Sequence, residues 1–162
     1  MGTRNLTIVK MDGKTRIAQY GQWDGYPTGQ GQEIADFLTD VNLKKFKEKL
    51  NELKEVDEKE VEKFLESLGS KDGWMNSEQS AKLHKRYPGI DRDRGAGILQ
   101  LIYDGEVTEV RLSEDFKNDS LFCEYFYTFN LDKETVQVNK SKEYTFDEWK
   151  KKGFMQELEN LM

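Results

Sequence analysis

The fold is indicated first by Leu121-Phe-Cys-Glu-Tyr-Phe-Tyr-Thr-Phe-Asn130, the longest segment of the chain with the pattern of a strand. Because successive side chains of a strand point to opposite sides, the odd-numbered residues from 121 to 129 share one face, and Phe122, Glu124, Phe126 and Thr128 share the other. Both faces are largely apolar, which predicts a central strand covered on two sides. Glu124 would then lie among aromatic rings and need a partner, because an unpaired buried carboxylate is costly.

Further strands are predicted on both sides of this segment in the sequence. The residues from Asn5 to Tyr20 alternate in hydrophobicity around Asp12-Gly13, which predicts a β-hairpin whose turn needs positive φ angles. Strands are also predicted at 107–112 and 136–138. Thr145 and Glu148 then have the spacing of a capping box, which predicts the start of a C-terminal helix that Gly153 interrupts.

Helices are predicted between the hairpin and the C-terminal strands. A short helix follows residue 31, and two more are predicted at 77–87 and 91–104. The Lys/Glu-rich segment 42–69 has two amphipathic stripes, which predict a charged helical hairpin inserted into the domain. Runs of like elements indicate an α+β fold, in which helices pack on an antiparallel sheet formed by the hairpin and three C-terminal strands. We expect one such domain over residues 1–162.

Composition excludes several classes of function. The net charge of -6 disfavours general nucleic-acid binding, and the apolar runs are too short to span a membrane. No signal peptide is recognised, so we expect a cytoplasmic protein. The single cysteine, Cys123, cannot form an intramolecular disulfide, and its apolar surroundings favour a buried, inert thiol. With His84 as the only histidine, we predict no metal site and no cofactor.

The segment Tyr20-Gly-Gln-Trp-Asp-Gly-Tyr-Pro-Thr-Gly-Gln-Gly31, called the Gly-aromatic block below, is the first candidate for a functional site. Its candidate binding residues are Tyr20, Gln22, Trp23, Asp24 and Tyr26. Tryptophan and tyrosine present rigid faces that can stack on a base or anchor in a protein pocket. The alternative is structural: a well-packed turn in which the indole covers the sheet and Asp24 caps backbone amides.

The second candidate is the segment Arg86-Tyr-Pro-Gly-Ile-Asp-Arg-Asp-Arg-Gly-Ala-Gly97, called the arginine segment below. Arg92 and Arg94 lie at the start of a predicted helix, where guanidinium groups and exposed amides favour an anion such as phosphate. An arginine of this segment is also the natural partner for Glu124, which would make Glu124 a structural or ligand-orienting acid and a further candidate binding residue. The alternative is that the two glycines permit close helix packing, while the arginines pair with Asp91 and Asp93.

Both ends of the chain carry segments that point to a family. They are Asn5-Leu-Thr, Ala18-Gln-Tyr-Gly-Gln-Trp-Asp-Gly-Tyr-Pro-Thr-Gly-Gln-Gly31, Ile98-Leu-Gln-Leu-Ile102, Asp119-Ser-Leu-Phe-Cys-Glu-Tyr-Phe-Tyr127 and Asn130-Leu-Asp132. These segments resemble recurring segments of uncharacterised small proteins encoded by bacteriophages and prophages. The resemblance implies a phage accessory protein that acts in the cytoplasm of the bacterial host cell.

That context favours a binder over an enzyme, because small phage accessory proteins often counter host defence by stoichiometric binding. We therefore predict a protein that inhibits a host anti-phage defence function, by sequestering a nucleotide-type signal or by blocking a defence protein. No residue is assigned a catalytic role in this hypothesis. The alternative is a small hydrolase or nucleotide-processing enzyme that uses Asp24 and Glu124 as acid and base. A structural role through homo-oligomerisation is a third hypothesis.

Overall fold

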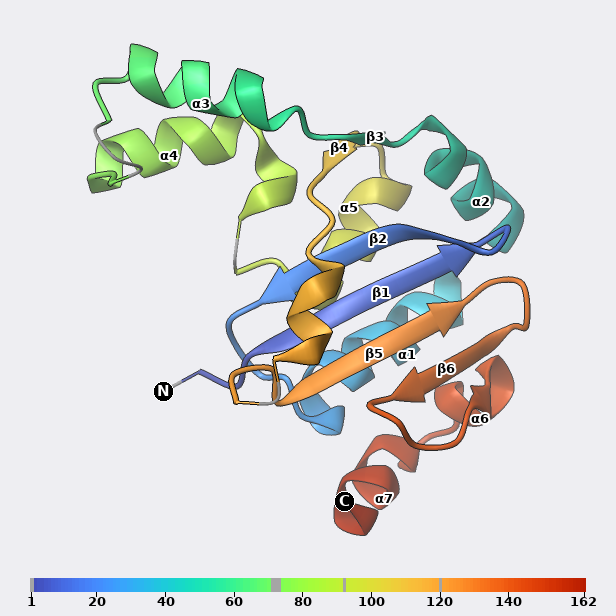
Figure 1. Ribbon diagram of the computed structural model, residues 1–162. Helices are drawn as coiled ribbons and strands as arrows, with labels where there is room; N and C mark the ends of the chain where they lie inside the picture. Colours follow the sequence, from blue (N-terminus) through green and yellow to red (C-terminus); the bar gives the residue numbers. More distant parts are fainter. Residues whose placement is uncertain (1, 71–73, 92, 120) are drawn as a thin grey trace.

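The structure, a computed structural model, describes residues 2–70, 74–91, 93–119 and 121–162. Within these residues the chain has an α+β fold built on a five-stranded mixed sheet (Figure 1). The strand order is β2-β1-β5-β6-β7, with β5 at the centre, as its two apolar faces predict. The strands are β1 Asn5–Met11, β2 Lys14–Gly21, β5 Tyr125–Asn130, β6 Thr135–Val138 and β7 Tyr144–Thr145.

The N-terminal hairpin is confirmed. β1 and β2 pair antiparallel, and the turn between them places Asp12 at φ 56° and Gly13 at φ 71°. The carboxylate of Asp132 accepts the N–H groups of Asp12 and Gly13, at 2.8 and 2.9 Å. These two hydrogen bonds hold the pKa of Asp132 below its usual value. The turn of the hairpin is therefore fastened to the connection between β5 and β6.

The sheet is mixed and not wholly antiparallel, because β1 and β5 run parallel, with Asn5 opposite Tyr125 and Lys10 opposite Asn130. A parallel pair needs a long crossover, and residues 12–124 supply it. The predicted strand 107–112 does not join this sheet. Only Glu109–Val110 of this segment forms a strand, β4, which pairs with β3 Lys54–Glu55 in a separate two-stranded sheet. The third C-terminal strand of the main sheet is β7.

The central strand is shorter than its sequence pattern suggests. β5 begins at Tyr125, because the Asp119 carboxylate accepts the N–H groups of Leu121 and Phe122 and turns the chain before the strand. Leu121 is consequently 78% exposed and Phe122 47% exposed. Glu124 precedes the strand and is exposed as well, so the prediction that it lies buried among aromatic rings is wrong.

Helices cover one face of the sheet and bury the main core with Val9, Ile17, Tyr127 and Phe129 (Figure 1). The fully buried Trp149 packs edge-on against Tyr127 in this layer. The predicted capping box at Thr145 is confirmed, as is the break at Gly153, whose φ is 82°. The elements on this side are the π-helical turn η1 Pro27–Gly31, α1 Gln32–Asp40, α2 Leu43–Glu52, the short helical turn η3 Gly95–Gly97, α5 Ile98–Tyr103, α6 Phe146–Lys150 and α7 Phe154–Leu161.

The segment 42–69 does form two helices, but they do not form a hairpin with each other. Phe46 and Leu50 of α2 enter the main core. The second helix, α3 Glu58–Ser67, packs instead against α4 Ser77–Arg86, in a separate small core that contains Val61 and Leu83. Figure 1 shows α2 and α3 at opposite ends of the upper edge. Both helices have the predicted apolar stripe, but each stripe is buried against residues that are distant in the sequence.

The other face of the sheet is only partly covered. The short helix η4 Glu114–Asn118 crosses in front of β1, and its Phe116 packs with Leu6, Ile8 and Ala18. In Figure 1 this face points to the viewer, and η4 is the unlabelled yellow-orange helix in front of the sheet. Among the residues that the structure describes, no helix covers the part of this face that β5 and β6 form (Figure 1).

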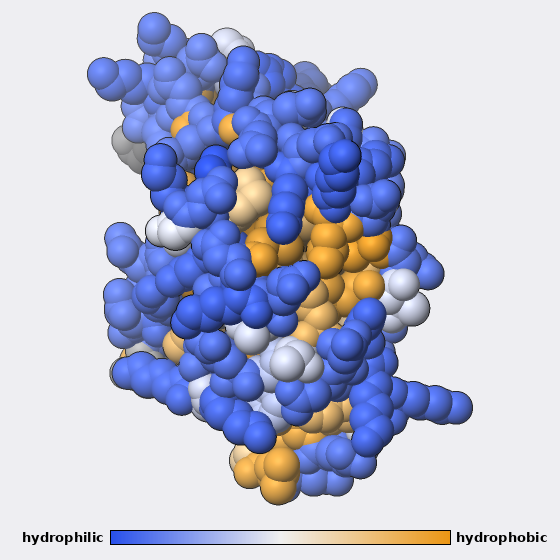
Figure 2. All heavy atoms as spheres, turned by 90° about the vertical axis from the view of Figure 1, so that its right-hand side faces the viewer, coloured by the Kyte–Doolittle hydropathy of each residue, from blue (hydrophilic) through white to orange (hydrophobic). Residues whose placement is uncertain are grey.

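Hydrophilic residues cover most of the surface in the side view of Figure 2, and hydrophobic residues gather in a band at mid-height and at the foot. The foot is the end of α7, where Leu161 is 81% exposed and Met162 53% exposed. Among the described residues, no helix combines the length and the apolar character that crossing a membrane requires.

The anchoring of α2 in the main core can be tested with Phe46→Ala. Phe46 is fully buried, with ring centroids 4.9 Å from Phe37 and 6.1 Å from Phe129. Loss of this ring should lower the free energy of unfolding by about 3 to 5 kcal/mol, measured by urea denaturation. The control Phe122→Ala removes a ring that is 47% exposed and should cost far less. Equal costs would contradict the placement of α2.

Candidate functional site

The Gly-aromatic block follows β2 and is held against the core by backbone contacts. The Gly25 N–H donates to the Thr3 carbonyl at 3.1 Å, and the Tyr127 hydroxyl donates to the Gly25 carbonyl at 2.6 Å. The indole N–H of Trp149 donates to the Gly31 carbonyl at 3.0 Å. The polar groups of two large core side chains, Tyr127 and Trp149, therefore bond to this block and fix its conformation.

One glycine of the block is required by close approach of the backbone to itself. The Gln30 N–H donates to the Asp24 carbonyl at 2.8 Å, which closes the chain into a tight loop. A Cβ atom on Gly29 would overlap that same carbonyl oxygen. Asp24 itself has a φ of 53°, a left-handed conformation that aspartate tolerates better than most residues. The composition of the block thus has a structural explanation.

Gln30 is the residue that ties the block to the arginine segment, and the sequence analysis did not identify it. Its side chain is buried, its Nε2 donates to the Trp23 carbonyl at 3.0 Å, and its Oε1 accepts the Ala96 N–H at 2.7 Å. Gly95 leaves room for this side chain, because a Cβ there would lie 2.7 Å from Oε1 of Gln30. In the sequence, the only sign of this role is that Gln30, a polar residue, stands between Gly29 and Gly31.

The aromatic candidates in the block keep part of their surface in solvent, but their polar groups are occupied. Trp23 is 49% exposed and its indole N–H donates to Asp93 at 2.9 Å. Tyr26 is 37% exposed and its hydroxyl donates to Asp24 at 2.9 Å. Tyr20 packs edge-on against Phe116, and its hydroxyl donates to Gln22 at 3.2 Å. These rings offer faces to a partner and few free hydrogen-bonding groups.

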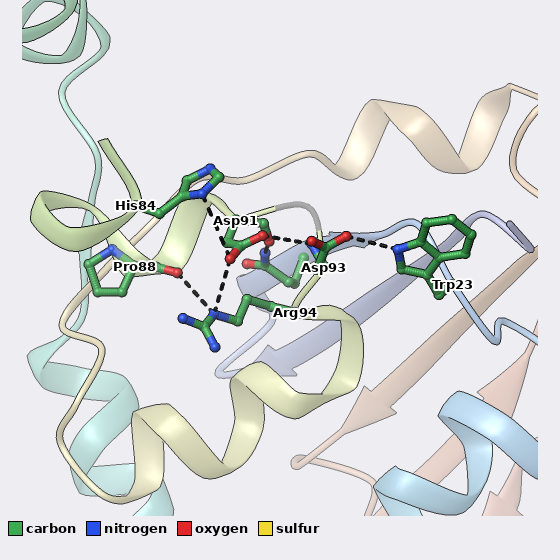
Figure 3. Close-up of polar contacts among 7 residues, drawn as sticks. Trp23, His84, Pro88, Asp91, Asp93 and Arg94 are labelled. Carbon is green, nitrogen blue, oxygen red and sulfur yellow. Dashed lines mark hydrogen bonds and ion pairs between the residues drawn. The ribbon is translucent and has the colours of Figure 1, made fainter. Parts of the chain in front are cut away.

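The arginine segment is organised around Asp91 (Figure 3). The Asp91 carboxylate lies 3.9 Å from Nε of Arg94 and 3.9 Å from Nδ1 of His84, and it accepts the Asp93 N–H at 2.9 Å. Arg94 also donates to the Pro88 carbonyl at 3.4 Å. Figure 3 shows Trp23 reaching this network through Asp93. Arg92 lies outside the described residues.

This arrangement favours the packing role of the arginine segment over the phosphate cradle. The Ala96 amide, at the predicted helix start, is already bonded to Gln30. Arg94 faces Asp91 and Pro88, and the expected pairing of Glu124 with an arginine is wrong for Arg94. The reason is that β5 starts after Glu124, so its carboxylate stays in solvent and needs no buried partner.

Glu124 instead lines a groove of about 660 Å³ on the open face of the sheet. Its floor is formed by Phe126 and Thr128 of β5 and by Gln137 of β6, while η4 lies on one side and the chain after β6 on the other. We call it the lysine groove. Its lining residues are Lys10, Lys117, Asn118, Cys123, Glu124, Phe126, Thr128, Gln137, Asn139 and Lys140.

The lysine groove concentrates positive charge in a chain whose net charge is -6. Three lysines line it, and Glu124 is the one carboxylate among its described lining residues. Lys117 also pairs with Glu114 of η4 at 3.3 Å. Although burial raises the pKa of Glu114, hydrogen bonds from Thr15 and Lys117 and the charges of Lys117 and Lys10 lower it on balance. The charges of Lys10 and Lys117 therefore both act on Glu114, at one end of the groove.

Cys123 lines the groove as a protonated thiol. Burial, and next the negative charge of Asp119, raise the pKa of its thiol to about 11. The thiolate is the nucleophilic form of cysteine, so this environment opposes a nucleophilic role. Asp24 does not line the groove, so the two carboxylates of the enzyme hypothesis do not share this cavity.

Comparisons with known proteins add no family to these observations: no family model, curated protein or solved structure matches the chain. The likeness to phage proteins therefore stays an expectation from the segments quoted above. Function has to be argued from the two regions themselves. The block and the arginine segment form an internally bonded unit, whereas the lysine groove presents side chains to solvent in a concave site.

The structural role of the block can be tested with Gln30→Ala. The change leaves the buried Ala96 N–H without its partner, and it removes one of the two donors to the Trp23 carbonyl, which keeps its hydrogen bond from Asn5. An unsatisfied buried N–H costs about 1 to 3 kcal/mol, so the free energy of unfolding should fall by about that amount in urea denaturation. Gln32→Ala is the control, because Gln32 is exposed and bonds only Asp36. Unchanged stability in Gln30→Ala would refute the role.

The state of Cys123 can be tested by alkylation with iodoacetamide, followed by mass spectrometry, because it is the only cysteine. Its pKa is raised to about 11 from 9.0, so at pH 8 the folded protein should hold about a hundredfold less thiolate than the unfolded chain. The rate should keep rising with pH towards 11, whereas in urea it should level off near 9. A native rate that levels off near 9 would contradict the raised pKa.

Proposed function

We propose that the protein binds a small phosphorylated ligand of nucleotide type in the lysine groove, with one ligand per site and without converting it. The observation that carries this proposal is the set of lysines around an apolar floor on the uncovered face of the sheet. Lysine ammonium groups are common phosphate ligands in proteins. A volume of about 660 Å³ lies in the range typical of small-molecule sites.

The other lining groups suit the remaining parts of a nucleotide. Phe126 offers a half-buried ring on the floor, and bases stack on aromatic rings with little dependence on sequence. Asn118 and Gln137 add amide groups, which can both donate to and accept from a sugar or base. Asn139 uses its Oδ1 to accept the Phe126 N–H at 2.9 Å, which holds its amide at the edge of this floor.

Binding without catalysis is favoured by the chemistry of the groove. The Cys123 thiol has a pKa of about 11 and is therefore protonated. Glu124 is the one carboxylate among the described lining residues, and Asp24 does not line the groove with it. The hydrolase alternative requires Asp24 and Glu124 to act on one substrate. No contact of these two side chains supports that requirement, so the alternative is not preferred.

The biological role we propose follows from the resemblance to phage proteins. In a bacterial host, a protein that binds a nucleotide-type signal stoichiometrically would lower its free concentration and so inhibit the defence function that depends on it. Direct blocking of a defence protein is the second form of the same hypothesis. The exposed rings of Trp23 and Tyr26 are the aromatic surface that such a protein contact would use.

The binding proposal can be tested by calorimetric titration with nucleoside monophosphates, nucleoside diphosphates and cyclic dinucleotides. At least one should bind, with an affinity that falls as salt is raised, because lysine–phosphate attraction is screened. Lys10→Gln and Lys117→Gln should each weaken binding about fivefold, the usual size of one exposed charge contact.

Lys152→Gln is the matched control for these variants, since it removes the same charge from an exposed lysine outside the groove. It should bind the ligand as the unaltered protein does. Failure of every nucleotide to bind at low salt would overturn the proposal. Equal losses in Lys152→Gln and Lys10→Gln would show that the attraction is not located in the groove.

A further inference from the structure

The lysine groove is electrostatically uneven along its length. Lys10 lies opposite Asn130 of β5 in the parallel register, whereas Glu124 precedes the first residue of that strand. The backbone between Glu124 and Asn130 spans about 20 Å at the rise of an extended chain. A carboxylate therefore lies at one end of the floor, and Lys10 and Lys117, which flank Glu114, lie towards the other. The third lysine, Lys140, follows Asn139, whose N–H donates to the Phe126 carbonyl at 2.7 Å, so Lys140 lies nearer to the Glu124 end.

Glu124 has a fixed backbone and an exposed side chain. Its N–H donates to the Arg4 carbonyl at 3.0 Å, which continues the pairing of β1 and β5 by one residue. Its side chain nevertheless stays in solvent at the wall of the groove. An ionised carboxylate only accepts hydrogen bonds, so Glu124 favours a ligand that brings N–H or O–H donors to this end and negative charge to Lys10 and Lys117.

A carboxylate is best satisfied by two parallel donors, one for each oxygen. Among the common bases, guanine alone presents two adjacent N–H donors on its Watson–Crick edge, from N1 and the exocyclic N2. Adenine and cytosine each offer one amino group next to a ring nitrogen that is an acceptor, and uracil offers one N–H between two carbonyl oxygens. An acceptor facing Glu124 would be repelled, so these bases fit less well.

We propose that Glu124 makes the lysine groove selective for guanine nucleotides, an inference that rests on nucleotide binding in that groove. The guanine N1–H and N2–H groups donate to the two carboxylate oxygens of Glu124. The base lies over Phe126, and the phosphate groups extend towards Lys10 and Lys117. Glu124, which the enzyme hypothesis used as an acid or base, then acts in recognition.

The ligand is a free nucleotide and not a nucleic-acid strand. The chain carries a net charge of -6, and the groove offers three lysines with Glu124 at its wall. Polymers are usually held by a basic stripe that follows many phosphates, which the composition does not favour. A short guanine-containing RNA should therefore bind no more tightly than the mononucleotide.

The experiment is a calorimetric titration of the protein with GMP, IMP, AMP, CMP and UMP at low salt. GMP and IMP differ only in the exocyclic amino group of guanine. GMP should bind at least about tenfold more tightly than IMP, the usual value of one hydrogen bond to a charged group. Glu124→Gln should abolish this preference, because the amide that replaces one carboxylate oxygen donates instead of accepting.

Glu157→Gln is the matched control: it removes one negative charge from an exposed residue of α7, outside the groove, and should keep the preference. Thermal unfolding of all variants checks that they fold. Equal affinity for the five nucleotides, or a guanine preference that survives in Glu124→Gln, overturns the selectivity while leaving nucleotide binding in place. Binding of none of them overturns both proposals, and tighter binding of guanine-containing RNA overturns the assignment to a free nucleotide.

Discussion

The parallel pairing of β1 with β5 is the constraint on which the other features depend. It inserts a strand from the C-terminal half between the N-terminal hairpin and β6, and it requires the long crossover that carries most of the helices. It also brings residue 124 beside the N-terminus, through the bond to Arg4. The groove exists because this insertion leaves the outer side of β5 and β6 uncovered, while η4 shields only the part near β1 and β2.

The Gly-aromatic block is part of the scaffold, and the lysine groove offers a binding surface, although their compositions suggest the reverse. The block looks functional because it is rich in glycine and aromatic residues, yet its backbone and its polar side chains are bonded to the core through Tyr127, Trp149 and Gln30. The groove is built from ordinary residues that are far apart in the chain. Its charge becomes apparent only when Lys10, Lys117 and Lys140 line one cavity.

The strand β5 connects the Gly-aromatic block with the lysine groove. The block bonds to the chain at the start of β1, through Thr3 and Asn5. The Tyr127 hydroxyl that holds Gly25 comes from β5, the same strand that forms the groove floor on its opposite side. One strand thus bonds the scaffold with its inward side chains and presents Phe126 and Thr128 outward. Such a site on a strand is held more precisely than one on a loop.

Sequence alone determined the elements whose causes are local. The Asp12-Gly13 turn, the capping box at Thr145, the break at Gly153 and the central position of β5 follow from turn chemistry and periodicity. Only the tertiary structure decided which surfaces meet: α2 and α3 bury their stripes apart, β1 runs parallel to β5, and Glu124 joins lysines instead of arginines. Local patterns specify which face of an element is apolar, whereas its partner is chosen by the packing of the whole chain.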